Sequence, residues 1–311
     1  MHRKSELPPA FVVRAFRTSE ARATGVSAKR LRSRDVHQPF RGLNVAGTMP
    51  ETVNERATAF AHLLRPADAF SHTTAAALLG APMPGFAERD RRLHVTTVGG
   101  GDRIRRSGVV GHTADVLAIT TLGSLPIVDP AHLFAQLATV IRHDDLVASG
   151  DYLVTPRRRG SRLMPALTSL DAIRAAIPER GRGAAAARRA LGDVRVGAES
   201  PMETRLRLLL VRSGLPEPQL NPAVPIGDDV LHPDLMYPQW GVVLEYEGDH
   251  HRTDAWQWRN DIWRREAFES AGLRVIRVHR DDIQAEPEAF LARLCHILAQ
   301  RGRSSAGNSG G

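Results

Sequence analysis

Two glutamates directly follow an apolar run in the segment VVLEYEGDHHR, residues 242–252. The apolar run is typical of a buried strand, in which successive side chains point to opposite faces. Glu245 and Glu247 therefore lie on the same face. Two carboxylates this close repel each other, so the pKa of one of them rises unless a cation lies beside them. The spacing thus predicts a cation at this end of the strand.

A third carboxylate in the same region indicates what that cation is. Asp234 precedes a turn near 237–241, and a hairpin around that turn brings Asp234 beside Glu245. Three acidic side chains at one end of a sheet provide oxygen ligands, which suit Mg²⁺ or Mn²⁺ better than Zn²⁺. Such a metal activates water and stabilises charge on a phosphate. We therefore predict that Asp234, Glu245 and Glu247 hold a catalytic divalent metal, with a solvated strand end as the alternative.

The residues around these carboxylates resemble a known group of nucleases. The ordered motifs are Pro233-Asp234, Glu245-x-Glu247-Gly248-x-x-His251, Asp261-x-x-Arg264 and Gly272-x-x-Val275-x-Arg277. They resemble the PD-(D/E)XK nuclease superfamily, in particular its very-short-patch-repair-like endonuclease domains, over about residues 199–300. The resemblance implies a four-stranded mixed sheet flanked by helices and metal-dependent cleavage of DNA phosphodiesters.

One position departs from the superfamily pattern. Where the superfamily has its lysine, this chain has Glu247, and no lysine follows Lys29. The very-short-patch-repair branch also lacks that lysine and uses histidine, so the resemblance makes His251, or the neighbouring His250, the acid or base. An imidazole with a pKa of about 6.5 can protonate a leaving oxygen or orient water. Arg264 is expected to stabilise phosphate charge by a bidentate contact.

Two further acidic residues have a structural interpretation beside the functional one. Glu203 either completes a capping box with Ser200 at a helix start or belongs to the outer shell of the metal site. Asp261 and Arg264 are three residues apart on a predicted helix, a spacing that often gives only a surface ion pair. The sequence leaves both alternatives open.

Charge is unevenly distributed along the chain. The 311 residues include 42 Lys and Arg against 34 Asp and Glu, for a formal net charge of +8. Basic residues exceed acidic ones in residues 1–198, whereas acidic residues exceed basic ones in residues 199–300. A preference for arginine codons explains the choice of Arg over Lys but not this division. A basic half is the electrostatic footprint of a protein that binds a polyanion such as DNA.

Residues 1–48 predict where DNA is contacted. The segment RTSEARATGVSAKRLRSRDV indicates a short helix from near Thr18 or Ser19, a turn at Gly25 and a second helix capped by Ser27. Residues 40–47, FRGLNVAG, then indicate a strand, so we expect a winged-helix-like unit. Its candidate DNA-binding residues are Lys29, Arg30, Arg32 and Arg34. The alternative is an ordinary solvated basic face.

Residues 50–155 predict a small α/β domain. Its strands RLHVTTV and GVVGHTA are separated by GGGDR, which has neither a dinucleotide fingerprint nor a phosphate-loop lysine and so predicts a hairpin turn. His72, His94 and His112 lack ligand spacing, so we expect structural histidines. The helix-turn-helix start, FSHTTAAALLGAPMP and LPIVDPAHLFAQLA resemble AbiEi-type antitoxins and transcriptional regulators over about residues 10–155. That resemblance implies DNA binding by the N-terminus, with autoregulation as one role.

The remaining segments complete the expected organisation. Residues 156–198 are predicted to be a helical linker and residues 301–311 a disordered tail. The single cysteine, Cys295, excludes an internal disulfide framework and a cysteine-based zinc site. Neither an apolar leader nor a run of about 18 apolar residues occurs, so no membrane partner is expected and the cytoplasm is the expected location.

Together these patterns predict an α/β protein: a winged-helix-like unit, a small α/β domain, and a restriction-endonuclease-like domain with a mixed sheet flanked by helices. The expected function is that of a Mg²⁺- or Mn²⁺-dependent DNA endonuclease with a basic DNA-binding half. The rival is a non-enzymatic, antitoxin-type transcriptional regulator that retains the nuclease fold and has a toxin as its partner. DNA is the expected partner in both cases, and a homodimer is left open.

Overall fold

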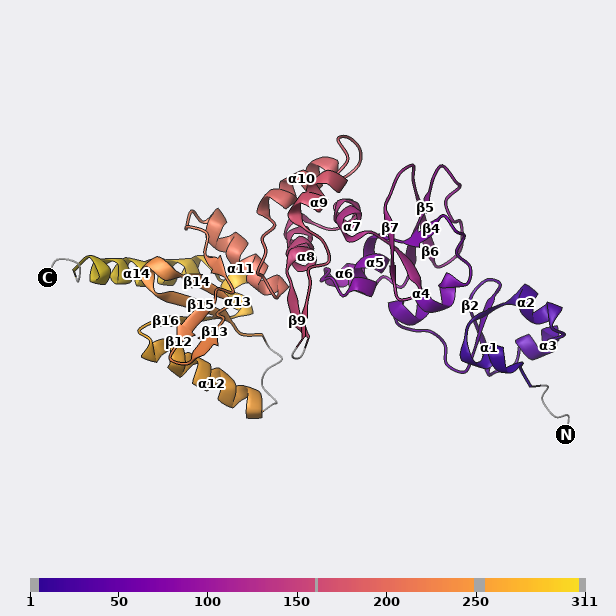
Figure 1. Cartoon of the computed structure of the whole chain (residues 1–311), viewed down its shortest axis with the longest axis horizontal. Coiled ribbons are helices and arrows are strands. Elements are labelled where there is room, and N and C mark those ends of the chain that lie inside the picture. Colours follow the sequence, from indigo (N-terminus) through magenta and orange to yellow (C-terminus); the bar gives the residue numbers. More distant parts are fainter. Residues whose placement is uncertain (1–5, 160–161, 249–254, 308–311) are drawn as a thin grey trace. The chain divides into compact units, whose positions relative to one another are not determined.

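The chain is a mixed α/β protein that divides into two compact units. The computed structural model describes residues 6–159, 162–248 and 255–307, and the side chains at 159, 255–261 and 304–307 also lie outside the description (Figure 1). One unit comprises Met1–Leu146 with Thr168–Arg189, and the other comprises Val147–Leu167 with Ala190–Gly311. We call them the N-terminal and C-terminal units.

The N-terminal unit begins with a small helical and strand region. Its elements are α1 (Pro9–Val13), β1 (Phe16–Arg17), α2 (Thr18–Ala23), α3 (Ala28–Leu31), β2 (Val36–Phe40) and β3 (Leu43–Ala46). The strands form an antiparallel sheet in the order β1-β3-β2. The sequence correctly predicted the turn at Gly25, whose φ is 85°, and the cap of α3, where Ser27 Oγ accepts a hydrogen bond from Arg30 N at 3.1 Å. Phe11, Phe16 and Val36 are buried in its core.

A five-stranded mixed sheet forms the rest of this unit. Its strands are β4 (Asp68–Phe70), β5 (Leu93–Val98), β6 (Val109–Ala114), β7 (Ile119–Leu122) and β8 (Leu125–Val128), in the order β6-β5-β4-β8-β7. The surrounding helices are α4 (Val53–Ala61), α5 (His72–Leu79), α6 (Gly85–Glu88), α7 (Pro130–Leu137) and α9 (Leu170–Ala176). Leu93 and Val95 of β5 are buried against Phe60 of α4. The alternate residues His94 and Thr96 therefore occupy the opposite face of β5, which contacts α5.

The predicted hairpin between β5 and β6 is wrong. The two strands pair in parallel, from Leu93 opposite Val109 to Val98 opposite Ala114. The connection 99–108 must therefore return along the sheet before β6 begins. It passes directly over Gly111, where an added Cβ would lie 2.1 Å from the carbonyl oxygen of Ile104. A side chain at this position would block the return path.

The C-terminal unit is built on a four-stranded mixed sheet in the order β11-β14-β15-β16. These strands are β11 (Gln219–Leu220), β14 (Leu235–Tyr237), β15 (Val242–Tyr246) and β16 (Arg274–Val278). The pairing of β15 with β16 is parallel, and the other two pairings are antiparallel. Two separate hairpins join β9 (Arg157–Arg159) to β10 (Arg162–Met164) and β12 (Val224–Ile226) to β13 (Asp229–Leu231).

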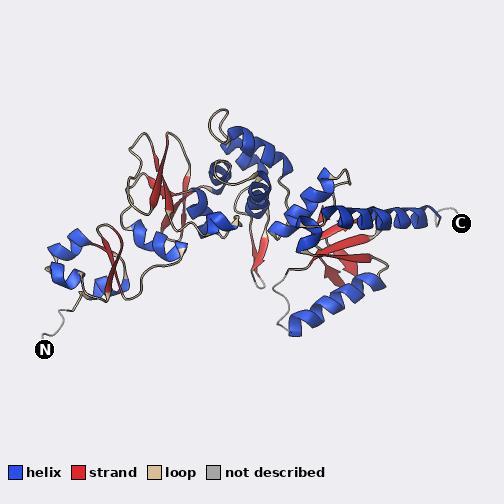
Figure 2. Cartoon of the chain, turned by 180° about the vertical axis from the view of Figure 1, so that it is seen from behind, coloured by secondary structure: helices blue, strands red, loops and turns tan. Residues whose placement is uncertain are grey.

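Helices cover both faces of this sheet, as Figure 2 shows. They are α11 (Pro201–Arg212), α12 (Ala255–Ser270), α13 (Arg280–Gln284) and α14 (Pro287–Gly307). Val242 and Leu244 are buried with residues of α11 and α14 on one face. Val243 is buried with Phe268 of α12 on the other. The alternation predicted for this strand is therefore confirmed, and Glu245 continues the face that α12 covers.

The predicted linker and tail are more ordered than expected. Residues 156–198 contain β9, β10, α9 and α10 (Ala184–Asp193), and they divide between the two units. Helix α8 (His143–Val154) is joined to α11 by a buried ion pair between Asp151 and Arg207, whose closest atoms are 3.3 Å apart. Residues 301–307 continue α14 instead of forming a tail, because Arg301 Nε donates to Trp240 O at 3.0 Å. No helix within the described residues is long and apolar enough to cross a membrane.

Candidate carboxylate site

The hairpin formed by β14 and β15 positions two of the predicted site residues. Leu235 pairs with Leu244, and Met236 pairs with Val243. The turn between the two strands ends at Gly241, whose φ is 58°. Continuing this register by one residue places Asp234 opposite Glu245. The Asp234 carboxylate also accepts a hydrogen bond from the backbone N–H of Tyr246 at 2.7 Å. This antiparallel arrangement agrees with the expectation from the sequence.

Arginines lie beside both glutamates of β15. Arg264 Nη2, from α12, is 3.2 Å from Glu245 Oε1 and also donates to the carbonyl of His232. Arg277, from β16, forms an ion pair with Glu247. The sequence argument required a cation near these two carboxylates, and in this structure guanidinium groups supply it. Repulsion between Glu245 and Glu247 therefore does not by itself require a metal.

A buried carboxyl group, Glu203, lies next to this hairpin and to the half-buried Asp234. Glu203 is the third residue of α11, and its side chain is only 5% exposed. Burial raises the pKa of Glu203 to about 7, and repulsion by Asp234 contributes to the rise. Burial also raises the pKa of Asp234 to about 6, although the Tyr246 N–H and Arg264 oppose the rise. It is therefore unfavourable for both carboxyl groups to be ionised at once, unless they share a proton or bind a cation.

Glu203 is held by contacts that differ from a reciprocal capping box. Ser200 Oγ accepts from the backbone N–H of Glu203 at 3.2 Å, as the capping interpretation predicted. The Glu203 carboxylate, however, accepts from Glu199 N at 2.8 Å and from Asn221 Nδ2 at 3.0 Å. Its side chain therefore faces Asn221 and Asp234 as well as the start of α11. Sequence reasoning gave Glu203 only an outer role.

Asn221 connects the Glu203 carboxylate to the backbone of Asp234, and sequence reasoning missed it. Its backbone N–H donates to the carbonyl of Asp234 at 3.0 Å while its side chain donates to Glu203. Asn221 has a φ of 43°, a left-handed conformation that asparagine tolerates better than most residues. The Asn221-Pro222 dipeptide, a turn signal directly after a short strand, could have identified it.

The donor set fits a hard divalent cation. Carboxylate and amide oxygens are the ligands that Mg²⁺ and Mn²⁺ prefer, and a cation would relieve the buried repulsion between Glu203 and Asp234. Within the described residues, however, the acidic side chains do not form a group of three whose ligand atoms all lie within 4.8 Å of one another. Binding by Asp234, Glu203 and Glu245 thus requires side-chain movement, including separation of Glu245 from Arg264.

Several predicted site residues lie outside the described part of the chain. His250 and His251 fall in the segment 249–254, and the side chain of Asp261 is also outside it. Their roles as acid or base and as outer-shell carboxylate therefore stay predictions.

The four basic residues predicted to contact DNA fall into two groups. Lys29, Arg32 and Arg34 are exposed, as a phosphate contact requires. Arg30 is 8% exposed, and its two terminal nitrogens bind the two carboxylate oxygens of Asp35 at 3.1 and 2.9 Å. This bidentate pair occupies the guanidinium, so the prediction of a DNA contact by Arg30 does not fit the structure.

The three histidines of the N-terminal unit are not scattered. His72, His94 and His112 come from three different elements, and each offers one ligand atom within 4.8 Å of the other two. The absence of a short ligand spacing in the sequence was misleading, because α5, β5 and β6 bring the three positions together in space.

Comparisons with known proteins add limited information. No family model and no solved structure matches the chain. Two uncharacterized proteins of Mycobacterium tuberculosis, from the strains CDC 1551 / Oshkosh and ATCC 25618 / H37Rv, are each 30% identical to it over 122 residues. The matched part is 39% of this chain and 45% of each relative, so the chain spans less than half the length of these curated relatives. Their names state no activity.

Proposed function

We propose that the C-terminal unit is a metal-dependent DNA endonuclease of the PD-(D/E)XK type. The observation that carries the proposal is the pair formed by the buried Glu203 and the half-buried Asp234 at one end of the inner strand β14, next to Glu245. Burying two carboxyl groups together costs stability unless they share a proton or a cation. Such costly arrangements are typical of functional sites. A sheet with helices on both faces and the motif order of the sequence are consistent with the nuclease fold.

Each residue of the site has a role in this proposal. Asp234 and Glu245, with Glu203 and Glu247 in support, would hold Mg²⁺ or Mn²⁺. A bound divalent cation supplies activation of water and neutralisation of charge on the phosphate. Arg264, on the same sheet face as Glu245, is placed to contact a phosphate oxygen there. His251 is assigned the transfer of a proton to the leaving oxygen.

The N-terminal unit would deliver DNA. The order α1-β1-α2-α3-β2-β3, with a three-stranded antiparallel sheet, supports a winged-helix-like unit. Lys29, Arg32 and Arg34 are exposed on or just after α3 and are its candidate phosphate contacts. Phosphate contacts of this kind position a protein on DNA without reading its sequence.

A cleavage assay with matched variants tests the proposal. The full chain is incubated with supercoiled, mismatched and single-stranded DNA in Mg²⁺, Mn²⁺ or EDTA. We expect cleavage only with metal, and at least a hundredfold loss in Asp234→Asn and Glu245→Gln, which keep side-chain size. Glu269→Gln, which removes an exposed carboxylate from α12, is the control and should cleave normally. Cleavage that persists in EDTA or in Asp234→Asn would exclude this site as its source.

A second candidate function is supported by the ion pairs of Glu245 and Glu247. Because Arg264 and Arg277 already neutralise these carboxylates, the unit could persist as a scaffold without metal. The protein would then be a non-enzymatic, antitoxin-type regulator whose N-terminal unit binds DNA. Metal-independent DNA binding without cleavage of any DNA form would favour this function, and a toxin partner would then be sought.

A further inference from the structure

Three histidines in the N-terminal unit converge without any role in the proposed nuclease. His72 begins α5, His94 lies on β5, and His112 lies on the edge strand β6. His72 and His94 are each 6% exposed, and His112 is partly buried. Each histidine offers one ring nitrogen as a metal ligand, and these three nitrogens all lie within 4.8 Å of one another. We propose that His72, His94 and His112 form a binding site for a divalent transition-metal ion of the Zn²⁺ class.

The distances fit the coordination of such an ion. His94 Nδ1 and His112 Nε2 are 3.1 Å apart. Two histidine nitrogens bound to one tetrahedral zinc ion, at about 2.0–2.1 Å each, are separated by about 3.3–3.4 Å. Only a small opening of this pair therefore admits the ion. The rings of His72 and His112 are stacked with centroids 3.8 Å apart, so loading also requires the His72 ring to turn out of the stack.

The chemical state of the three imidazoles also suits metal binding. A histidine ligates through a nitrogen lone pair and must be neutral. Burial, together with the neighbouring histidines and Arg182, lowers the pKa of His72 to about 2 and that of His112 to about 4. Burial likewise lowers the pKa of His94. Burial thus acts in the same direction on all three rings.

Contacts behind the rings fix their orientation. The Asp90 carboxylate lies 4.0 Å from His94 Nε2, on the side away from His112. This distance is too long for a hydrogen bond, and Arg92 Nε and Nη2 donate to the same carboxylate, so Asp90 acts on His94 only as a nearby negative charge. A carboxylate behind a ligating histidine is a recurring feature of metal sites. Ser71 Oγ lies 3.0 Å from His72 Nδ1, a hydrogen bond that holds the His72 ring in either tautomer because a hydroxyl can donate or accept.

The backbone of His72 is held in an unusual conformation. Its φ is 47°, and among the described residues only Asn221 is another non-glycine with a positive φ. Conformations of this kind persist where surrounding contacts enforce them, and they cluster at functional sites. Here the His72 N–H donates to Gln136 Oε1 at 3.2 Å, and Gln136 Nε2 in turn donates to Thr96. The strain places the His72 ring over β5 and β6 instead of away from them.

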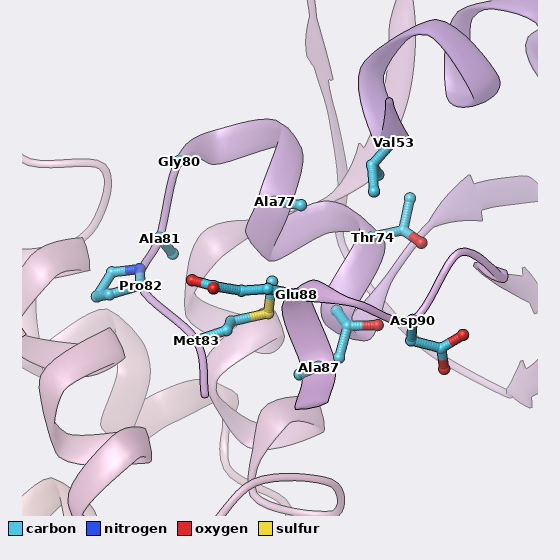
Figure 3. Close-up of a pocket in the computed structure, with 11 residues that line it drawn as sticks. Val53, Thr74, Ala77, Gly80, Ala81, Pro82, Met83, Ala87, Glu88 and Asp90 are labelled. Carbon is cyan, nitrogen blue, oxygen red and sulfur yellow. The ribbon is translucent and has the colours of Figure 1, made fainter. Parts of the chain in front are cut away.

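A cavity of about 300 Å³ lies behind His94, and none of the three histidines lines it. Its lining includes Asp90, which faces His94, and Thr74, whose hydroxyl accepts from the His94 N–H at 2.7 Å. Figure 3 shows Thr74 and Asp90 at one end of the cavity and Ala81 and Pro82 at the other. Three histidine ligands leave the fourth position of a zinc-class ion for water or a small anion.

Metal titration of the full chain tests the proposal. After removal of metals with EDTA, the protein is titrated with Zn²⁺ and with Co²⁺, whose visible absorption reports tetrahedral nitrogen ligation. We expect one equivalent to bind and Mg²⁺ in excess not to displace it. His112→Gln should lose this binding, and Asp90→Asn should weaken it by about 10–100-fold. The control His296→Gln changes an exposed histidine of α14 and should bind like the wild type.

Two further results separate this site from the carboxylate site. Asp234→Asn should retain the Zn²⁺ equivalent, because its carboxylate belongs to the other unit. The Co²⁺ spectrum of the wild type tests imidazole ligation even if a histidine variant fails to fold. A wild-type chain that gives no such spectrum, or a His112→Gln variant that binds Zn²⁺ unchanged, would show that the histidines only pack against one another.

Discussion

Replacing Glu203 by glutamine should stabilise the protein at pH 8 in the absence of metal. The side chain keeps its size and an oxygen that accepts from Glu199 N and Asn221 Nδ2, but it no longer places a second negative charge beside Asp234. It also gains an amide N–H that can donate a hydrogen bond to the Asp234 carboxylate. The substitution therefore removes the repulsion without opening a cavity.

The sign and the size of the effect follow from the pKa of Glu203. It is about 7 in the folded state against 4.5 for the free side chain. Between these values the folded state holds a proton that the unfolded state has released, so stability falls as the pH rises from 4.5 to 7. Each pH unit of this window is worth about 1.4 kcal/mol, so the loss at pH 8 is at most about 3.5 kcal/mol. In a unit of this size, that corresponds to about 7–14 °C in Tm.

Differential scanning calorimetry in EDTA at several pH values between 4.5 and 8 measures this effect. Wild-type Tm should fall across the window, whereas Glu203→Gln should lose most of that dependence and melt higher at pH 8. Mg²⁺ or Mn²⁺ should raise the wild-type Tm more than that of the variant, because the cation relieves the same repulsion. Glu269→Gln removes an exposed carboxylate and should follow the wild type. Identical pH profiles for wild type and Glu203→Gln would refute the reasoning that the carboxyl pair is strained.

Three other substitutions test separate parts of the structure. Arg32→Ala should reduce the slope of log DNA affinity against log salt by about 0.9. Arg30→Ala should instead lower Tm, because it removes a buried guanidinium and its bidentate contact with Asp35; the opposite pattern would reverse the two assignments. Asp151→Asn should destabilise the chain by about 1–3 kcal/mol in denaturant unfolding, because it weakens a buried ion pair although Arg207 keeps Glu217 as a partner; an unchanged midpoint would contradict this. Gly111→Ala should cost about 1–3 kcal/mol or more in the same assay, since the new Cβ meets the backbone of the returning loop, and an unchanged midpoint would show that the loop yields.

Local sequence signals correctly predicted many elements of the fold. Ser27 and Gly25 marked the start of α3 and the turn before it. These signals are reliable because capping and left-handed turns depend on a few neighbouring residues. The same holds for Val242–Tyr246, whose period-two pattern alone places Val243 and Glu245 on one sheet face.

Part of the carboxylate site was also readable from the sequence. The pairing of Asp234 with Glu245 follows from the length of a single hairpin. The contribution of Glu203 was underestimated because α11 precedes the hairpin by many residues, and only packing brings it to Asp234. Asn221 has no chemistry of its own to attract notice, and its role arises from a backbone conformation that the fold imposes.

Three features of this protein depend on contacts between residues that are distant in sequence, and only the tertiary structure shows them. Arg264 and Arg277 reach Glu245 and Glu247 from other elements, so no local pattern could show which cation neutralises them. The parallel pairing of β5 and β6 depends on a loop that crosses Gly111, and no short-range rule specifies it. His72, His94 and His112 meet because that pairing and the packing of α5 place them on one face. The sequence by itself determined the helix caps, turns and strand faces, because neighbouring residues specify them. The carboxylate–arginine pairs and the cluster of three histidines form only when distant elements pack together.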